Sequence, residues 1–189
     1  MALGEDTVTV RLGPAEVALR PSLRAALALA RRHGSPAALA SLIAGGSLQA
    51  ARDTLQHAGG VHPDAFTAFL EAQPVGDALQ AIRAPLLAFC LLLAIPAEAD
   101  GTEAPTEQHA EPVTWPDAFE RLYTIATGWL GYTPADAWHA TPTELAIAYR
   151  GRLELLRAVF GGGEEKPKRP ASLDDRARLA FARFDVVPA

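Results

Sequence analysis

Hydrophobic and polar residues alternate near the start of the chain, and the pattern then changes to a helical spacing. Residues 7–12 read TVTVRL, which would place Val8, Val10 and Leu12 on one face of a strand. A glycine–proline turn signal follows at residues 13–15, after which apolar positions resume. The pattern predicts a short β-hairpin, which must pack on helices because two strands alone are marginally stable.

Apolar residues at helical spacing fill the chain from there to residue 95. Serines that can cap a helix precede three of these stretches, and glycines that can end a helix follow them. The predicted helices lie between Ser22 and Gly34, between Ser35 and Gly45, between Ser47 and Gly59, and in residues 63–72 and 75–95. Pro85 is expected either to kink the last helix or to divide it in two.

Three similar helix starts occur in residues 114–160. Each has a threonine at the N-cap, a proline close behind it and an acidic residue three positions on, which resembles a capping box. These starts lie at Thr114, Thr133 and Thr141. In the last of the three helices, the spacing predicts the following inward-facing residues: Leu145, Tyr149, Leu153, Leu156 and Phe160. A further amphipathic stripe predicts a tail helix that starts at Ser172.

The net charge of −5 is concentrated in one segment of the chain. Residues 96–113 hold five acidic residues and no Lys or Arg, while the other segments sum close to zero. Since this segment is rich in Ala, Glu, Pro and Thr, we predict an extended, exposed linker. The fold class is therefore mainly α, with a hairpin packed on a helical domain (1–95), an acidic linker (96–113), a small three-helix domain (114–160), and a glycine-rich connector with a tail helix (161–189).

Composition and motifs exclude several classes of function. One cysteine rules out a disulfide framework and a multi-cysteine metal site. The predicted helices of residues 114–160 resemble a helix–turn–helix arrangement, which binds DNA in some proteins. A pI near 5.5 for the chain and a net charge of −1 in residues 114–160 argue against binding of nucleic acid. The five histidines form no HExxH motif, and Walker A, GxGxxG and GxSxG motifs do not occur. We therefore expect no catalysis, no cofactor and no metal.

The longest charge-free apolar run covers residues 84–97. Its length of about 14 residues falls short of the roughly 20 that a bilayer span needs, so we expect a buried helix and no membrane binding. Cys90 is then a small core residue rather than a reactive thiol. Glu5 and Asp6 stand where a secretory leader would have basic and apolar residues, which predicts a cytoplasmic protein.

Tryptophan is concentrated in the predicted three-helix domain. All three tryptophans, Trp115, Trp129 and Trp138, lie within residues 115–138. They either form the core of this small domain, or one of them is an exposed anchor for a partner protein. Trp129 is expected to pack inside, while both roles stay open for the other two. Phe181 and Phe184 in the tail either dock on the body or await a partner's groove.

The stretch from Trp115 to Arg152 resembles the small tail assembly chaperones of long-tailed phages and gene transfer agents. An ordered set of residues carries this resemblance: Trp115, Gly128, Leu130-Gly131, Pro134, Trp138 and Thr141-Pro142-x-Glu144-Leu145. The hairpin and Ala-rich helices of residues 7–95 are similar to the companion tail protein encoded beside the tube gene in gene-transfer-agent-like clusters. The linker and the 29-residue tail belong to neither pattern.

The resemblance implies a tail assembly chaperone that binds the tape measure protein, recruits tail tube subunits and is absent from the mature virion. Two units in one chain parallel the short and extended chaperones of other phages, where the longer product commonly arises by frameshifting. The residues expected to contact a partner protein are Trp115, Trp138, Tyr132, Leu145, Phe181 and Phe184. The alternatives are a structural tail protein, such as a terminator or connector, and a helical DNA-binding regulator. Self-association also stays open.

Overall fold

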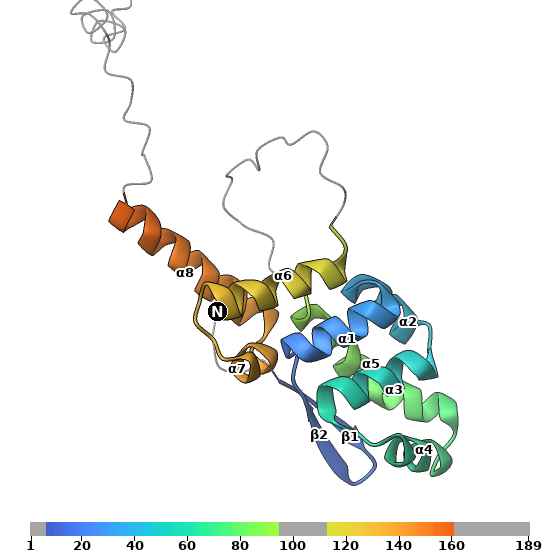
Figure 1. Cartoon of the computed structure of the whole chain (residues 1–189). Coiled ribbons are helices and arrows are strands. Elements are labelled where there is room, and N and C mark those ends of the chain that lie inside the picture. Colours follow the sequence, from blue (N-terminus) through green and yellow to red (C-terminus); the bar gives the residue numbers. More distant parts are fainter. Residues whose placement is uncertain (1–6, 95–112, 161–189) are drawn as a thin grey trace, which may run out of the picture. The chain divides into compact units, whose positions relative to one another are not determined.

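The structure is a computed structural model of the chain, and it describes residues 7–94 and 113–160 (Figure 1). The predicted linker, apart from Val113, and the predicted tail helix with Phe181 and Phe184 lie outside the described residues. The described part contains eight helices and one antiparallel pair of strands. The prediction of a mainly α fold with an N-terminal hairpin is confirmed.

The hairpin consists of β1 (Val8–Leu12) and β2 (Ala15–Leu19), with Val10 opposite Val17. Gly13 opens the two-residue loop with a φ of 63°, a backbone conformation that glycine adopts without steric cost. Val10 and Leu19 are completely buried, because the alternating pattern turns one face of the hairpin towards the helices.

Five helices follow the hairpin, and their bounds are α1 (Leu23–His33), α2 (Pro36–Ala44), α3 (Leu48–Gly59), α4 (Pro63–Glu71) and α5 (Val75–Leu92). The side chains of Ser22, Ser35 and Ser47 each accept a hydrogen bond from the backbone N–H three residues on, as their N-cap positions predicted. Pro85 lies inside α5 and does not divide it. We attribute this continuity to the buried residues around Pro85, Ile82 and Leu86, which anchor the helix to the core on both sides of the proline.

Among the described helices, α5 is the one that is long and apolar enough to cross a membrane by length and composition. A core helix passes the same test, and the side chains of Ile82, Leu86 and Phe89 are at most 1% exposed within the protein core. Cys90 is also buried, which confirms its predicted place. Burial raises the pKa of the Cys90 thiol to about 12, so the thiol stays protonated and unreactive at neutral pH.

The second group of helices consists of α6 (Trp115–Gly128), α7 (Pro134–His139) and α8 (Pro142–Phe160). The threonines before α6 and α7 accept a hydrogen bond from the backbone of the aspartate three residues on. At the start of α8 the capping box is complete. The Thr141 N–H donates to Glu144 Oε2 at 2.7 Å, and the Glu144 N–H donates to Thr141 Oγ1 at 3.1 Å.

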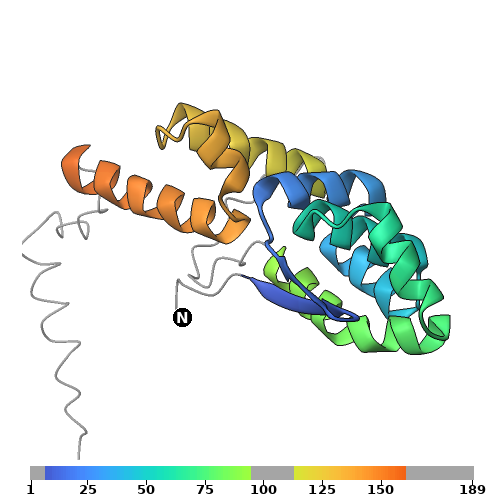
Figure 2. The same ribbon diagram turned by 90° about the horizontal axis from the view of Figure 1, so that it is seen from below.

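Residues 7–94 and 113–151 belong to one compact unit, and the second unit begins at Arg152. Figures 1 and 2 both show α6 beside α1, which packs against α6 and α7. Phe119 and Leu122 of α6 share a hydrophobic cluster with Leu23 and Leu29 of α1. The two segments lie on either side of the acidic stretch in the sequence, and their apolar faces bury more surface by packing on each other than either could alone.

The predicted inward face of α8 is only partly covered. Leu145 is completely buried and Tyr149 is half-buried, but Phe160 is 77% exposed, so its predicted inward position is wrong. Helical spacing identifies which side chains share a face of a helix. Whether that face is buried depends on a neighbouring element that covers it, and spacing along one helix holds no information about such a neighbour.

The contact between α3 and the hairpin leaves no room for a side chain at Gly59. A Cβ atom there would lie 2.6 Å from Val17 Cγ1 and 2.7 Å from Leu19 Cδ2. Gly59→Ala is therefore expected to lower the free energy of unfolding by about 1–3 kcal/mol, because the hairpin must shift. At Gly76 in α5 an added Cβ meets nothing within 4 Å. Gly76→Ala is the matched control, expected to raise stability by about 0.5–1 kcal/mol. Equal effects of the two changes in urea denaturation would contradict the close contact.

Candidate functional site

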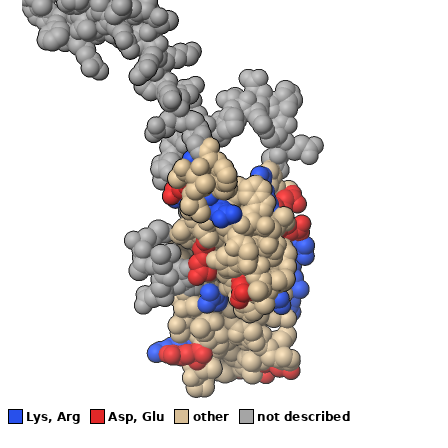
Figure 3. Space-filling view, turned by 60° about the vertical axis from the view of Figure 1, so that its left-hand side comes forward, with Lys and Arg blue, Asp and Glu red and all other residues tan. Residues whose placement is uncertain are grey.

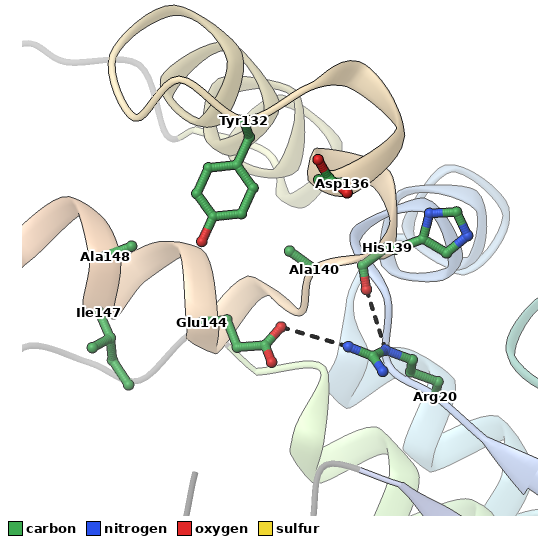
Figure 4. A pocket seen from close by; sticks show the side chains of 8 residues that line it. All are labelled: Arg20, Tyr132, Asp136, His139, Ala140, Glu144, Ile147 and Ala148. Atoms are coloured by element: carbon green, nitrogen blue, oxygen red, sulfur yellow. Dashed lines mark hydrogen bonds and ion pairs between the residues drawn. The ribbon is translucent and has the colours of Figure 1, made fainter. Parts of the chain in front are cut away.

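An open pocket of about 480 Å³ lies where α7 turns into α8 (Figure 4). Tyr132 points into it from the loop before α7, and Glu144 reaches it from the first turn of α8. Arg20, from the junction between β2 and α1, closes one side. Ile147 and Ala148 contribute an apolar wall. The pocket therefore combines residues that are far apart in the sequence.

Arg20 is held in this pocket by two contacts. Its Nε donates to the His139 carbonyl at 3.2 Å, and its Nη2 lies 3.8 Å from Glu144 Oε2. Next to it, the Leu23 N–H donates to the Ala140 carbonyl at 2.8 Å. The Arg20–Glu144 ion pair is partly exposed, so it contributes little stability, on the order of 0–1 kcal/mol. Its main effect is to orient the guanidinium against the α7–α8 corner.

The polar groups of the pocket already serve the helix ends. Asp136 Oδ2 accepts a hydrogen bond from Thr133 Oγ1 at 2.6 Å, and the Glu144 carboxylate caps α8. His139 Nδ1 lies 2.7 Å from the Ala135 carbonyl in its own helix. The pocket thus offers a polar rim of one cation and two carboxylates beside an apolar wall. Such a rim and wall suit the binding of a peptide surface.

Trp138 lies on the other side of α7, beside α1. Its ring stacks on Tyr123 of α6, with centroids 4.3 Å apart and planes at 23°. The guanidinium carbon of Arg24 lies 5.7 Å from the centre of the Trp138 ring. Trp138 is half-buried and lines a second open pocket, of about 330 Å³. One face of the indole is therefore fixed by packing, and the side chain also borders a surface.

The remaining predicted partner residues have different surroundings. Trp115 is half-buried and packs on Phe119, with ring centroids 5.6 Å apart. Leu145 is completely buried in the core, which leaves its side chain no exposed surface. Trp129 is 56% exposed, so the expectation that it packs inside is wrong. It is the C-cap residue of α6, and its ring lies edge-on to Tyr149 of α8 with centroids 6.0 Å apart, a contact that leaves more than half of the side chain exposed.

Sequence reasoning missed a charged cluster around Asp53 of α3. The Asp53 side chain is 0% exposed. Its Oδ1 lies 3.2 Å from Arg32 Nη1 and 3.4 Å from Arg52 Nη2, and its Oδ2 lies 3.3 Å from His33 Nε2. Asp53 follows the buried Ala50 by three positions, so helical spacing could have identified it as an acidic residue on the buried face.

The Asp53 cluster is an ion-pair network at the C-terminal end of α1, where the basic residues also complement the helix dipole. Burial lowers the pKa of His57 the most, and the positive charge of Arg32 lowers it further. Both causes favour the neutral form of His57. Within residues 7–94 and 113–160, no group of three or more His, Cys, Asp or Glu side chains is arranged to hold a metal ion.

Acidic and basic side chains are interspersed on the face of the molecule that Figure 3 shows. A surface that binds DNA would gather Lys and Arg to contact successive phosphates. The mixture on this face instead suits contacts with another protein, where alternating charges set orientation.

Comparisons of the chain with protein-family models, with curated proteins and with solved structures find no match. The description of this protein therefore rests on its fold and on the site described above. It is a mainly α protein with an N-terminal hairpin, whose aromatic side chains border two open pockets on either side of α7.

Proposed function

We propose that this protein is a tail assembly chaperone of a long-tailed phage or prophage, which binds the tape measure protein and recruits tail tube subunits without catalysis. One observation carries the proposal. Tyr132 and Trp138, both from the stretch that resembles tail assembly chaperones, border open pockets on the two sides of α7. Aromatic side chains in such positions are common anchors of protein–protein contacts.

The chemistry of the expected partner agrees with these pockets. A tape measure protein is long and helical, with apolar patches that are exposed before assembly. A chaperone for it needs apolar anchors with a polar rim, so that an amphipathic helix can bind and later leave. The Tyr132 pocket has the apolar wall of Ile147 and the polar groups of Arg20 and Glu144.

The compact unit of residues 7–94 and 113–151 changes the expected mechanics of the chaperone. Two independent modules on a tether would raise the local concentration of one partner near the other. In one packed unit, the surfaces of residues 7–94 and 114–151 instead keep a fixed spacing. The proposed chaperone would therefore present tape measure and tube proteins in a defined arrangement.

Co-expression tests the proposal. The full chain is expected to raise the soluble fraction of the tape measure protein encoded beside it, measured after lysis and centrifugation. Trp138→Ala should weaken the effect, because it removes the indole that borders the pocket. Trp138→Phe keeps an aromatic ring against Tyr123 and should retain most of it, while Leu42→Ala, at an exposed position on α2, should have no effect.

An equal soluble fraction of tape measure protein with and without the chain would contradict the proposal. Mass spectrometry of purified particles separates the main alternative. A chaperone leaves before maturation, so its peptides should be missing from virions, whereas a structural tail protein would be present at a fixed ratio to the tube subunit.

A further inference from the structure

We infer that the exposed face of α1 beside Trp138 is the docking site for an acidic amphipathic helix of a partner protein. This Arg24–Trp138 surface consists of Arg24, Leu27, Ala28 and Arg31 of α1 together with Trp138 of α7. The inference rests on the proposed function in one respect, since it assigns the surface that the chaperone's partner would use.

The spacing along α1 arranges two cations around an apolar centre. Positions 24, 27, 28 and 31 follow one another at three- and four-residue steps, so they form one stripe along the helix. Arg24 and Arg31 are two turns apart, about 10 Å along the axis. Between them lie the partly exposed Ala28 and Leu27, whose side chain is only 5% exposed, and the Trp138 indole adds an aromatic wall to the pocket of about 330 Å³.

Arg24 is available to a carboxylate from outside. Within the described part of the chain it makes no ion pair, and its guanidinium lies over the Trp138 ring at 5.7 Å. A guanidinium has five N–H donors, so this ring contact leaves donors for a bidentate contact with a carboxylate. Trp138 itself packs on Tyr123, so the ring beside this cation is positioned before a partner arrives.

Arg31 has one internal partner. Its Nη2 lies 2.6 Å from Glu120 Oε1, and both side chains are more than half exposed. A guanidinium has five N–H donors, so this contact leaves donors for a second carboxylate. The surface thus has two guanidinium groups against one carboxylate, and its excess charge is positive.

Charge and shape together specify the occupant. A facing helix would need two carboxylates seven residues apart, to match Arg24 and Arg31, and a large apolar side chain between them to contact Ala28 and Trp138. Arg and Trp are the residue types that most often dominate the binding energy of protein interfaces. The bidentate charge contacts would orient the helix, and the apolar centre would supply buried area.

A synthetic amphipathic helix tests the assignment without the tape measure protein. The probe carries two Glu seven residues apart with Leu between them, and its counterpart carries Lys at the same two positions. Binding of each labelled peptide to the full chain is measured by fluorescence anisotropy. We expect the Glu peptide to bind the natural chain at least about tenfold more tightly than the Lys peptide, and less tightly as salt is raised.

The charge-reversed variant Arg24→Glu should lose most of the affinity for the Glu peptide and gain affinity for the Lys peptide. This exchange of preference distinguishes a binding role from a folding defect, which would weaken both. Arg121→Glu makes the same change of charge at an exposed position on α6 and should leave both affinities unchanged.

Equal binding of both peptides, or no binding of the Glu peptide to the natural chain, would overturn the inference. A large gain in affinity after the acidic residues of segment 96–113 are replaced by their amides would also overturn it, because this chain's own segment would then be the occupant. If the peptide binds as expected but co-expression has no effect on the tape measure protein, the docking surface stands and the proposed function fails.

Discussion

Replacing Phe119 by alanine is expected to lower the free energy of unfolding by about 3–5 kcal/mol. Phe119 of α6 is 1% exposed and belongs to the hydrophobic cluster that also holds Leu23 and Leu29 of α1. The loss has two sources, since the ring no longer leaves water on folding and a cavity remains between packed helices. An effect of this size is a large part of the stability of a typical domain.

Phe119→Ala also tests whether residues 7–94 and 114–151 unfold together. In one compact unit, the change should reduce hydrogen-exchange protection of amides in α1 and α3 as well as in α6. Phe160→Ala is the matched control, because Phe160 is 77% exposed and its loss should cost less than about 0.5 kcal/mol. Loss of protection confined to α6, α7 and α8 would show instead that the helices of residues 114–151 unfold independently.

The second large effect is expected at Asp53. Asp53→Asn keeps the shape of the side chain and removes its charge, which leaves His33 buried beside a neutral amide and takes the carboxylate from Arg32 and Arg52. Breaking a buried ion pair costs about 3–5 kcal/mol when one charge is left behind. The side chains of Arg32 and Arg52 are 48% and 46% exposed, so they regain hydration, and we expect the lower end, about 3 kcal/mol.

Asp64→Asn provides the comparison for Asp53→Asn. Asp64 makes the same type of contact, 3.3 Å from a ring nitrogen of His62, but its side chain is 91% exposed. Its replacement should cost less than about 1 kcal/mol in equilibrium urea unfolding. Similar losses for both aspartates would mean that the burial of Asp53 does not strengthen its ion pairs.

The two buried positions also set limits for binding experiments. Variants at Phe119 or Asp53 are expected to weaken partner binding simply by reducing the folded population. Arg24 and Trp138 are better positions for tests of recognition, because Arg24 is exposed and Trp138 is half-buried at a pocket. A change of binding at these positions, with the unfolding transition preserved, would report on the partner surface itself.

The helix starts could be predicted because they depend on a few neighbouring residues. Ser22, Ser35 and Ser47 cap helices as their positions indicated, and Thr141 with Glu144 forms the capping box read from the sequence. The two-residue turn at Gly13 is equally local. Each of these features involves hydrogen bonds or backbone angles within about four residues, so the chain needs no distant partner to favour them.

Burial at single positions could not be predicted in the same way. Periodicity correctly placed Leu145 inward, but the same residue was also expected to contact a partner, and its complete burial removes that surface. Trp129 and Phe160 look like core residues by type, yet both are exposed. Asp53 looks like a solvated charge, yet it is buried among cations from α1 and α3.

The sequence by itself determined the mainly α class, the hairpin, the order of the helices and the concentration of aromatic residues in residues 115–138. Only the tertiary structure decided that α6 packs on α1, that Arg20 joins the α7–α8 corner, and that Arg24 lies over Trp138. The physical reason is the range of the interactions. Caps and turns are made between neighbours in the chain, whereas burial and charge pairing depend on which distant surfaces pack together, and that choice belongs to the whole fold.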